Sequence, residues 1–326
     1  MERLIRSEVF IYHDETACAG NENLRGHILF FVPVITIVEF KDSLFGSQTS
    51  EYTPWTVLFE KIEEIRNKFN ENHKFHFSKI SGKKWYKQDI ADKYFTQLGV
   101  EALKQKNMFC KLGIIFYKNP KSCDIAGYGG NKKKEKLLRF YETILRMLFK
   151  GIVHHLYDNN NKVKILKIIT DGEPYHRKLS NYRILERLID EIKDFVEIDK
   201  DAEINPNSSD HKKYNKNFIE YIHANMLQLS DMLLGSTIYS CLKNSNIEEK
   251  NPRIKDYVKD KKGIIACPVK KMLDKRKRKS GFQNSIHYKA FIISKAIIKN
   301  GKWKFEDVMT KEILIDQVSS QINLFE

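Results

Sequence analysis

The stretch VKILKIIT, residues 163–170, is followed directly by Asp171 and decides the fold class of this chain. Its apolar residues fall on both sides of the strand, which is typical of a strand covered by helices on both faces of a sheet. A second run, EVFIYHD at residues 8–14, ends in Asp14 in the same way. Sites in open α/β sheets lie at the carboxyl ends of the strands. The two aspartates therefore mark the predicted site end of the sheet.

Outward from these runs, strand-like and helix-like patterns alternate along the chain. Strands are predicted at residues 8–14, 27–39, 109–117, 163–170 and, as a fifth, 217–222, for which 195–198 is the alternative. Helical spacing of apolar residues is found at 55–69, 90–106, 135–157, 179–195 and 226–242. Pro33 predicts a bulge, an edge or a break in the second strand. This order predicts an α/β fold: a mixed five-stranded sheet that opens with an antiparallel hairpin, with helices on both faces.

The C-terminal part of the sequence differs in composition from the part before it. Seven of the ten residues in 270–279 (KKMLDKRKRK) are Lys or Arg. Asn300-Gly301 between two strand-like runs is a strong signal for a hairpin with a type I′ turn. We therefore predict a main α/β domain over residues 1–245 and a C-terminal basic extension with a hairpin over 246–326.

Composition limits the class of protein. Of the 326 residues, 41% are hydrophobic, which is enough for a packed core, and no apolar run approaches the roughly 20 residues of a membrane helix. The N-terminus has no signal-peptide core. Five cysteines without a C-x-x-C spacing argue against a disulfide framework or a structural zinc site. These features predict a cytoplasmic protein that does not bind membranes.

The net charge of +15 suits a polyanionic partner, and nucleic acid is the expected one. The alternative is compositional drift, because Lys, Asn and Ile are plentiful throughout the chain, as in proteins from AT-rich genomes.

A third acid, Asp231, lies within the unusually apolar helical run LQLSDMLLG, residues 227–235, where an unpaired charge is costly. If the strands ending in Asp14 and Asp171 are neighbours, their carboxylates lie about 5 Å apart laterally, and a helix across that end brings Asp231 to the same point. Carboxylates this close repel unless a divalent cation with oxygen ligands neutralises them. The alternative is structural, because an Asp after a strand commonly caps a turn or a helix.

Three segments of the sequence resemble the domain of unknown function 3800 family. IYHDET (11–16) is similar to an apolar strand ending in Asp-Glu-Ser-Gly, ITDGE (169–173) to a strand ending in Asp, and LQLSDMLLG (227–235) to a helix start of the form Leu-Gln-Leu-Ala-Asp-Leu. Together they frame residues 8–243. The resemblance implies a ribonuclease H-like fold.

The resemblance also implies site residues. Asp14, Asp171 and Asp231 would be the metal-binding and catalytic acids, with Glu15 close to them. The sequence departs from the family pattern at Thr16-Ala17, which replaces Ser-Gly, and at Lys74, which stands near a place where an acid is usual. A fourth carboxylate is then either absent or comes from elsewhere, and the candidates in the second case are Glu15, Glu60 and Glu173.

The predicted activity is hydrolysis of phosphodiester bonds in DNA or RNA, with Mg²⁺ or Mn²⁺ as the cofactor. One alternative is a catalytically inactive module that binds nucleic acid or a protein partner, and another is a phosphoesterase that acts on a small nucleotide. A protein partner or a homo-oligomer stays open.

Further residues are assigned lesser roles. His76, Glu173 and Gln228 are auxiliary candidates, although a lone His between two Phe residues is more often structural. Two basic clusters are candidate contacts to nucleic-acid phosphates, with a solvated charge run as the plain alternative. They comprise Lys132, Lys133, Lys134, Lys275, Arg276, Lys277, Arg278 and Lys279.

Overall fold

The structure, a computed structural model, describes residues 2–17, 24–42, 46–80, 87–118, 131–171, 185, 188, 195–242, 260–277, 290–299 and 302–307. Its strands are β1 (Glu2–Ala17), β2 (Leu24–Asp42), β3 (Gly46–Tyr52), β4 (Lys111–Lys118), β5 (Asn161–Asp171), β6 (Val196–Ile198), β7 (Ile204–Asn207), β8 (Phe291–Lys299) and β9 (Lys302–Asp307). Its helices are α1 (Pro54–Phe69), α2 (Lys87–Lys104), α3 (Lys133–Leu156), α5 (Ile219–Leu242) and α7 (Lys261–Lys277), with short 3₁₀ turns η1 (Phe77–Lys79) and η3 (His211–Lys213).

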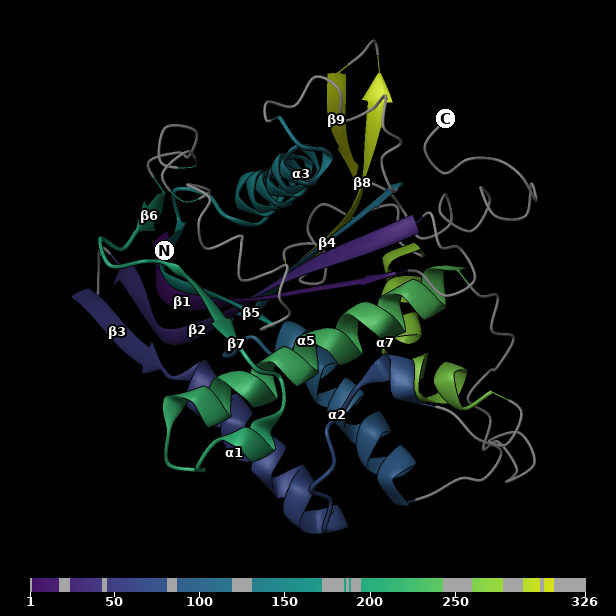
Figure 1. The fold of residues 1–326 in the computed structure, drawn as a ribbon. Coiled ribbons are helices and arrows are strands. Elements are labelled where there is room, and N and C mark those ends of the chain that lie inside the picture. The colour runs from purple at the N-terminus through teal and green to yellow at the C-terminus, as the bar shows by residue number, and fades with distance from the viewer. Residues whose placement is uncertain are drawn as a thin grey trace.

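All these strands form one mixed sheet (Figure 1). Its order is β6-β5-β1-β2-β4-β8-β9, with β3 paired to β2 and β7 paired to β5. β1 and β2 are antiparallel, and so are β2 and β4, whereas β5 runs parallel to β1 and β8 runs parallel to β4. The amino-terminal ends of β1, β4, β5 and β8 therefore lie at one end of the sheet, and their carboxyl ends lie at the other.

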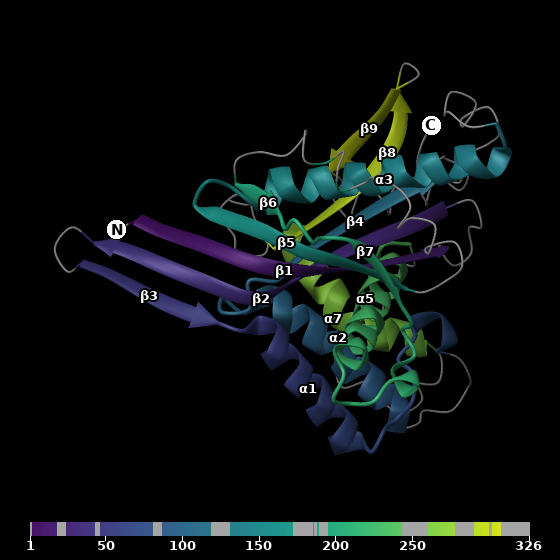
Figure 2. The same ribbon diagram turned by 60° about the vertical axis from the view of Figure 1, so that its left-hand side comes forward.

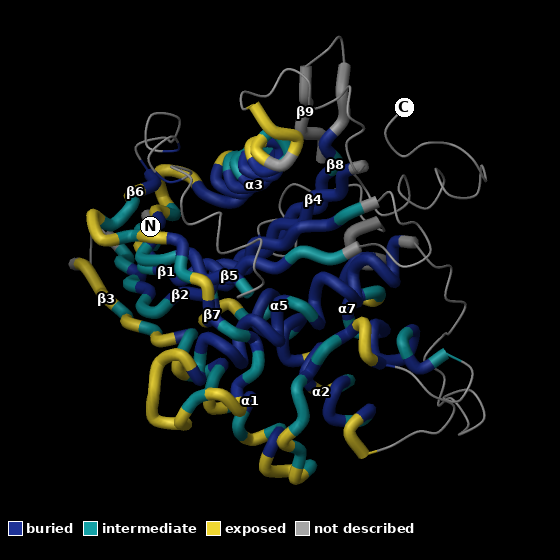
Figure 3. The backbone as a smooth tube through the Cα atoms, in the orientation of Figure 1, coloured by how far each residue is buried: buried dark blue, intermediate teal, exposed yellow. Residues whose placement is uncertain are grey.

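Helices cover both faces of the sheet (Figure 2). One core lies between the sheet and α1, α2, α5 and α7, and a second core lies between the sheet and α3. The central strands between these layers are buried, whereas the far ends of α1 and α2 are exposed (Figure 3). The helix α3 approaches the sheet closely at Gly113, where an added Cβ would collide with Ile152. An α/β fold with a mixed sheet and helices on both faces is thus confirmed.

Several sequence predictions hold in detail. The strands β1, β2, β4 and β5 and the helices α1, α2, α3 and α5 form where apolar periodicity places them. The bulge predicted at Pro33 is present, because Glu8 pairs with Ile35 while Val9 pairs with Pro33, so that β2 carries one extra residue there. Most of the predicted helix 179–195 lies outside the described residues.

The prediction of five strands is wrong, because the described residues form a nine-stranded sheet. Residues 217–222 form a turn and, from Ile219, the start of α5 instead of a strand, whereas the alternative at 195–198 is confirmed as β6. The sequence GSQTSEY forms β3, an edge strand that has too few apolar residues to give a strand pattern. The short β7 contains Pro206, which also weakens the pattern.

The hairpin predicted at the C-terminus forms from β8 and β9, with Lys299 paired to Lys302 across Asn300-Gly301. It was expected in an extension separate from residues 1–245. However, β8 pairs with β4 over Leu112 to Phe116, so the main sheet continues across the expected boundary. Helix α7 also packs against α2 and α5. The reason is that Phe291, Ile292 and Ile293 are apolar on both sides of the strand and become buried beside β4.

Among the helices in the described ranges, none combines the length and apolar character needed to cross a lipid bilayer.

Candidate functional site

Asp14 and Asp171 are brought to the same face of the sheet by strand register. β1 and β5 are parallel neighbours in which His13 pairs with Thr170, so the next residue on each strand is an aspartate. Side chains alternate between faces, and the preceding residues on the same face, Tyr12 and Ile169, belong to the core beneath α5. The side chains of Asp14 and Asp171 therefore emerge towards α5.

Asp231 reaches this end of the sheet from α5, which packs against β1, β2 and β5. Burial raises the pKa of Asp14 well above its usual range, and the negative charges of Asp231 and then Asp171 raise it further. The backbone N–H of Glu15, 2.8 Å from Oδ1 of Asp14, acts in the opposite direction. Asp14 is 8% exposed as a residue, and its carboxyl lies in the field of two further acids.

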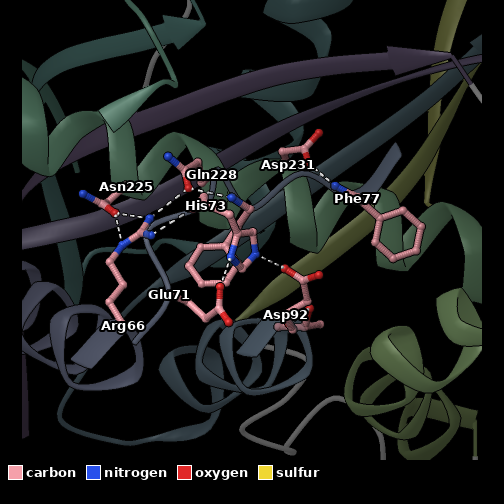
Figure 4. Close-up of polar contacts among 10 residues, drawn as sticks. Arg66, Glu71, His73, Phe77, Asp92, Asn225, Gln228 and Asp231 are labelled. Atoms are coloured by element: carbon pink, nitrogen blue, oxygen red, sulfur yellow. Dashed lines mark hydrogen bonds and ion pairs between the residues drawn. The ribbon is translucent and has the colours of Figure 1, made fainter. Parts of the chain in front are cut away.

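The other two acids are held by nearby loop residues. Asp231 Oδ2 accepts from the backbone N–H of Phe77 at 2.7 Å (Figure 4), and it lies 2.9 Å from Nδ1 of His76. Asp171 accepts from the backbone N–H of Ser209 at 3.1 Å and from its hydroxyl at 2.8 Å. Such donors fix the orientation of each carboxylate.

Gln228 joins the two loops that hold these acids. Its Oε1 accepts from the backbone N–H of Phe75 at 2.9 Å and from Nη2 of Arg66 at 3.0 Å. Its Nε2 donates to the carbonyl of Ser209 at 2.7 Å and to Nδ1 of His211 at 3.0 Å. Gln228 is fully buried and contacts both loops, so it positions them relative to α5.

Arg66 completes this support. Its Nε and Nη2 donate to Oδ1 of Asn225 at 3.1 and 2.8 Å, and its Nη1 donates to the carbonyl of His73 at 3.0 Å. His73 in turn bridges Glu71 and Asp92 at 3.1 and 3.0 Å (Figure 4). Segment 71–77 is therefore tied to α1, α2 and α5.

A close approach of backbone also fixes Phe77. A Cβ at Gly235, one helical turn beyond Asp231, would collide with the Phe77 ring. Only glycine at this position lets η1 lie against α5, which brings the Phe77 N–H to the Asp231 carboxylate.

Glu15 was expected beside Asp14, but strand alternation turns its side chain to the opposite face. There the hydroxyl of Tyr117 donates to Oε1 of Glu15 at 2.9 Å. Nε2 of His27 lies 3.0 Å from the same hydroxyl, Nδ1 of His27 lies 2.8 Å from Nε2 of His13, and Nδ1 of His13 lies 2.9 Å from the Thr170 hydroxyl. Glu15 thus ends a buried polar chain beneath α3.

The last step of this chain has a defined direction, because the Tyr117 hydroxyl gives its proton to Glu15. The Tyr117 oxygen then accepts from Nε2 of His27.

The remaining predicted residues are placed as follows. Lys132 and Lys133 are exposed at the start of α3, and Glu60 is exposed on α1. The backbones of Lys134, Lys275, Arg276 and Lys277 lie in helices, but their side chains are outside the described part. Arg278, Lys279 and Glu173 lie wholly outside the described residues.

Two functional candidates were missed from the sequence. Ser209 lies in the polar loop after β7, where only its turn-forming neighbours Asn207, Ser208 and Asp210 gave a signal. Lys262 is brought from the C-terminal part by α7, and its Nζ lies 3.3 Å from the carbonyl of Ser78 and 5.7 Å from the Phe77 ring centroid. No local pattern links Lys262 to η1, because the contact spans nearly 200 residues.

The donor set suits a hard divalent cation, which prefers carboxylate oxygens. Within the described residues, Oδ2 of Asp14 and Oδ1 of Asp231 accept no hydrogen bond. As the side chains stand, no three or more His, Cys, Asp or Glu residues of the described ranges form a group arranged to hold a metal ion. Both carboxylate oxygens of Asp171 accept hydrogen bonds from Ser209. For Asp171 to bind the same cation as Asp14 and Asp231, its oxygens must share these hydrogen bonds with the cation or give them up.

Comparison of the chain with protein-family models, with curated proteins and with solved structures found no match.

Proposed function

We propose that this protein hydrolyses phosphodiester bonds in nucleic acid, using a divalent metal ion held by Asp14, Asp171 and Asp231. The main support is the environment of Asp14, because burial and the negative charges of Asp231 and Asp171 all disfavour ionisation of its carboxyl. Such a cluster is costly in isolation and becomes favourable around a cation. The excess of positive charge elsewhere suits a polyanionic substrate.

We assign the core a ribonuclease H-like fold. The support is the antiparallel arrangement of β1, β2 and β4, to which β5 and β6 are added in parallel on the far side of β1. The acids then lie at the carboxyl ends of β1 and β5, which is the usual place for a site in an α/β sheet.

Mg²⁺ or Mn²⁺, when bound, would neutralise charge on the phosphate and lower the pKa of a coordinated water. Ser209 orients Asp171, and the Phe77 N–H orients Asp231. His76 contacts Asp231 through Nδ1 and is partly exposed, so it is placed to contact a phosphate or to carry a proton. Lys262 adds positive charge beside η1 and is placed to attract the substrate backbone.

The test is cleavage of labelled single-stranded and double-stranded DNA and RNA in Mg²⁺, Mn²⁺ or EDTA. Asp14→Asn and Asp231→Asn should each reduce the rate of cleavage by more than roughly 10–100-fold. That range is the usual loss when a residue that only hydrogen-bonds to a metal ligand is substituted. Asp201→Asn is the matched control, because Asp201 is exposed in the turn before β7 and hydrogen-bonds locally through its backbone.

The control variant should retain wild-type cleavage, and all three variants should melt cooperatively. Full activity in either Asp14→Asn or Asp231→Asn would contradict the assignment. Cleavage that persists unchanged in EDTA would remove the metal from the proposal.

A second candidate is a module that binds nucleic acid or a protein partner without turnover. The contacts of Asp171 with Ser209 and of Asp231 with Phe77 favour it, because both acids have a structural use without metal. Under this candidate, Mg²⁺ and Mn²⁺ leave the melting temperature unchanged, whereas salt-sensitive binding of nucleic acid persists.

A further inference from the structure

The end of the sheet opposite the acids contains a cavity of about 600 Å³. It lies where β1 and β4 begin, since both run antiparallel to β2 and start at the same end. The carboxyl ends of α2 and α3 and the turn at 158–161 complete its wall. This volume is in the range of pockets that bind small molecules. The cavity is therefore separate from Asp14 and Asp171, which lie at the other ends of their strands.

The lining of this cavity is strongly basic. Its lining residues include four Lys or Arg residues and one Asp, Asp158, and His155 is also part of the wall. The four are Arg3, Lys104, Lys106 and Lys111. A concave surface with charges of one sign concentrates the field and raises the local concentration of anions.

Lys111 gives this charge a buried component. The residue is only 8% exposed, and its Nζ lies 5.6 Å from the ring centroid of Tyr157. Charges in such a weakly screened place act on an incoming anion more strongly than surface charges do. Arg3 and Lys106 contribute from the exposed rim.

An aromatic ring lies beside these cations. Phe109 lines the cavity, and the Arg3 guanidinium carbon is 5.8 Å from its ring centroid and 5.6 Å from that of Phe40. Phe109 has φ of 50°, in the left-handed region that a bulky residue rarely adopts. Strain of this kind costs about 1–3 kcal/mol and persists where surrounding contacts fix the residue. Tyr52, 5.4 Å away between centroids, is one such contact.

We propose that this cavity is a second binding site, specific for a phosphate group carried by a nucleotide or by the end of a nucleic-acid strand. The Lys and Arg side chains bind the phosphate, and the Phe109 ring provides a face on which a base can stack. The proposal is independent of the metal-dependent activity, because none of its residues contacts the acids at the other end of the sheet.

The test measures binding in EDTA, so that no cleavage can occur. A short fluorescent oligonucleotide with a 5′-phosphate is compared with its 5′-hydroxyl form by anisotropy, and AMP and inorganic phosphate serve as competitors. Arg3→Glu and Lys106→Glu change exposed side chains, and Lys200→Glu makes the same charge change in the exposed turn before β7. A cooperative melt of each variant shows that it is folded.

The protein is expected to bind the 5′-phosphate oligonucleotide more tightly than the 5′-hydroxyl form. Binding of the 5′-phosphate form should be at least tenfold weaker in Arg3→Glu and Lys106→Glu, and it should change less than twofold in Lys200→Glu. Competition by AMP identifies a nucleotide as the ligand. Competition by phosphorylated strands alone identifies a strand end. Equal loss in all three variants, or equal binding of both oligonucleotides, would overturn the proposal, because bulk charge would then explain the binding.

Discussion

At the carboxyl ends of β1 and β5, the two faces of the sheet differ in charge and in how their polar groups are paired. Beneath α5, the buried Asp14 is opposed by Asp171 and Asp231. Beneath α3, the neighbouring His13 joins a chain of hydrogen bonds through His27 and Tyr117. One face therefore concentrates like charges, whereas the other pairs its polar groups with one another. Residues adjacent in sequence thus serve opposite purposes.

The largest expected effect on stability is on the face beneath α3. His27→Ala removes a buried ring and leaves His13 and Tyr117 without a partner at its place, so the free energy of unfolding should fall by about 2–4 kcal/mol. Urea denaturation at neutral pH measures this. The matched control, His154→Ala, changes an exposed residue near the end of α3 and should stay within about 0.5 kcal/mol. Similar losses in both variants would refute the paired chain.

A smaller effect of opposite sign is expected on the acidic face. Asp14→Asn should raise the free energy of unfolding at pH 7 in EDTA, because burial and the charges of Asp231 and Asp171 raise the pKa of Asp14 and make its ionised form costly in the folded protein. The folded-state pKa lies above the usual 3.8, so the ionisation cost is present at neutral pH and vanishes as pH falls towards 3.8. A variant less stable than wild type at pH 7 would show that the charge is already compensated.

A pH-dependent effect concerns two histidines on the α5 side. Burial lowers the pKa of His211 to about 3 and that of His223 to about 4. The unfolded chain then binds more protons between these values and 6.5, so stability should fall as pH decreases through this window. In the Asp14→Asn background, which removes the opposing dependence of Asp14, the slope should be at most about 1.4 kcal/mol per pH unit for each histidine.

Denaturation at pH 6.5, 5.5 and 4.5 measures this slope. The slope should be smaller in His211→Gln, because this substitution removes one of the two titrating imidazoles. A flat profile in the Asp14→Asn background would mean that neither imidazole needs to be neutral in the folded protein.

Much of the central fold was predictable because its signals are local. The runs at 8–14 and 163–170 are apolar enough to specify β1 and β5, and the spacing in 226–242 specifies most of α5. Polar edge strands such as β3 give no such pattern, because their formation depends on a neighbouring strand. The union of β8 with β4 also depends on a contact between distant segments.

Some residues of the candidate site were likewise predictable from local sequence, and others were not. Asp14, Asp171 and Asp231 could be identified from their positions after strands and within an apolar helix. The opposite orientation of Glu15 follows from strand alternation, a rule that the sequence already contained once β1 was identified. The contacts of Ser209 and Lys262 could not be predicted from the sequence. Each contact forms because a loop or a helix packs against a segment that is distant in the chain.

The sequence by itself determined which segments become the central strands and helices, and which acids stand at their ends, because periodicity and burial act over a few neighbouring residues. The tertiary structure alone decided that Gln228 ties the loops of both acids together and that basic residues from three elements gather at the far end of the sheet. Those arrangements arise from packing between segments that lie tens to hundreds of residues apart, and no local pattern encodes them.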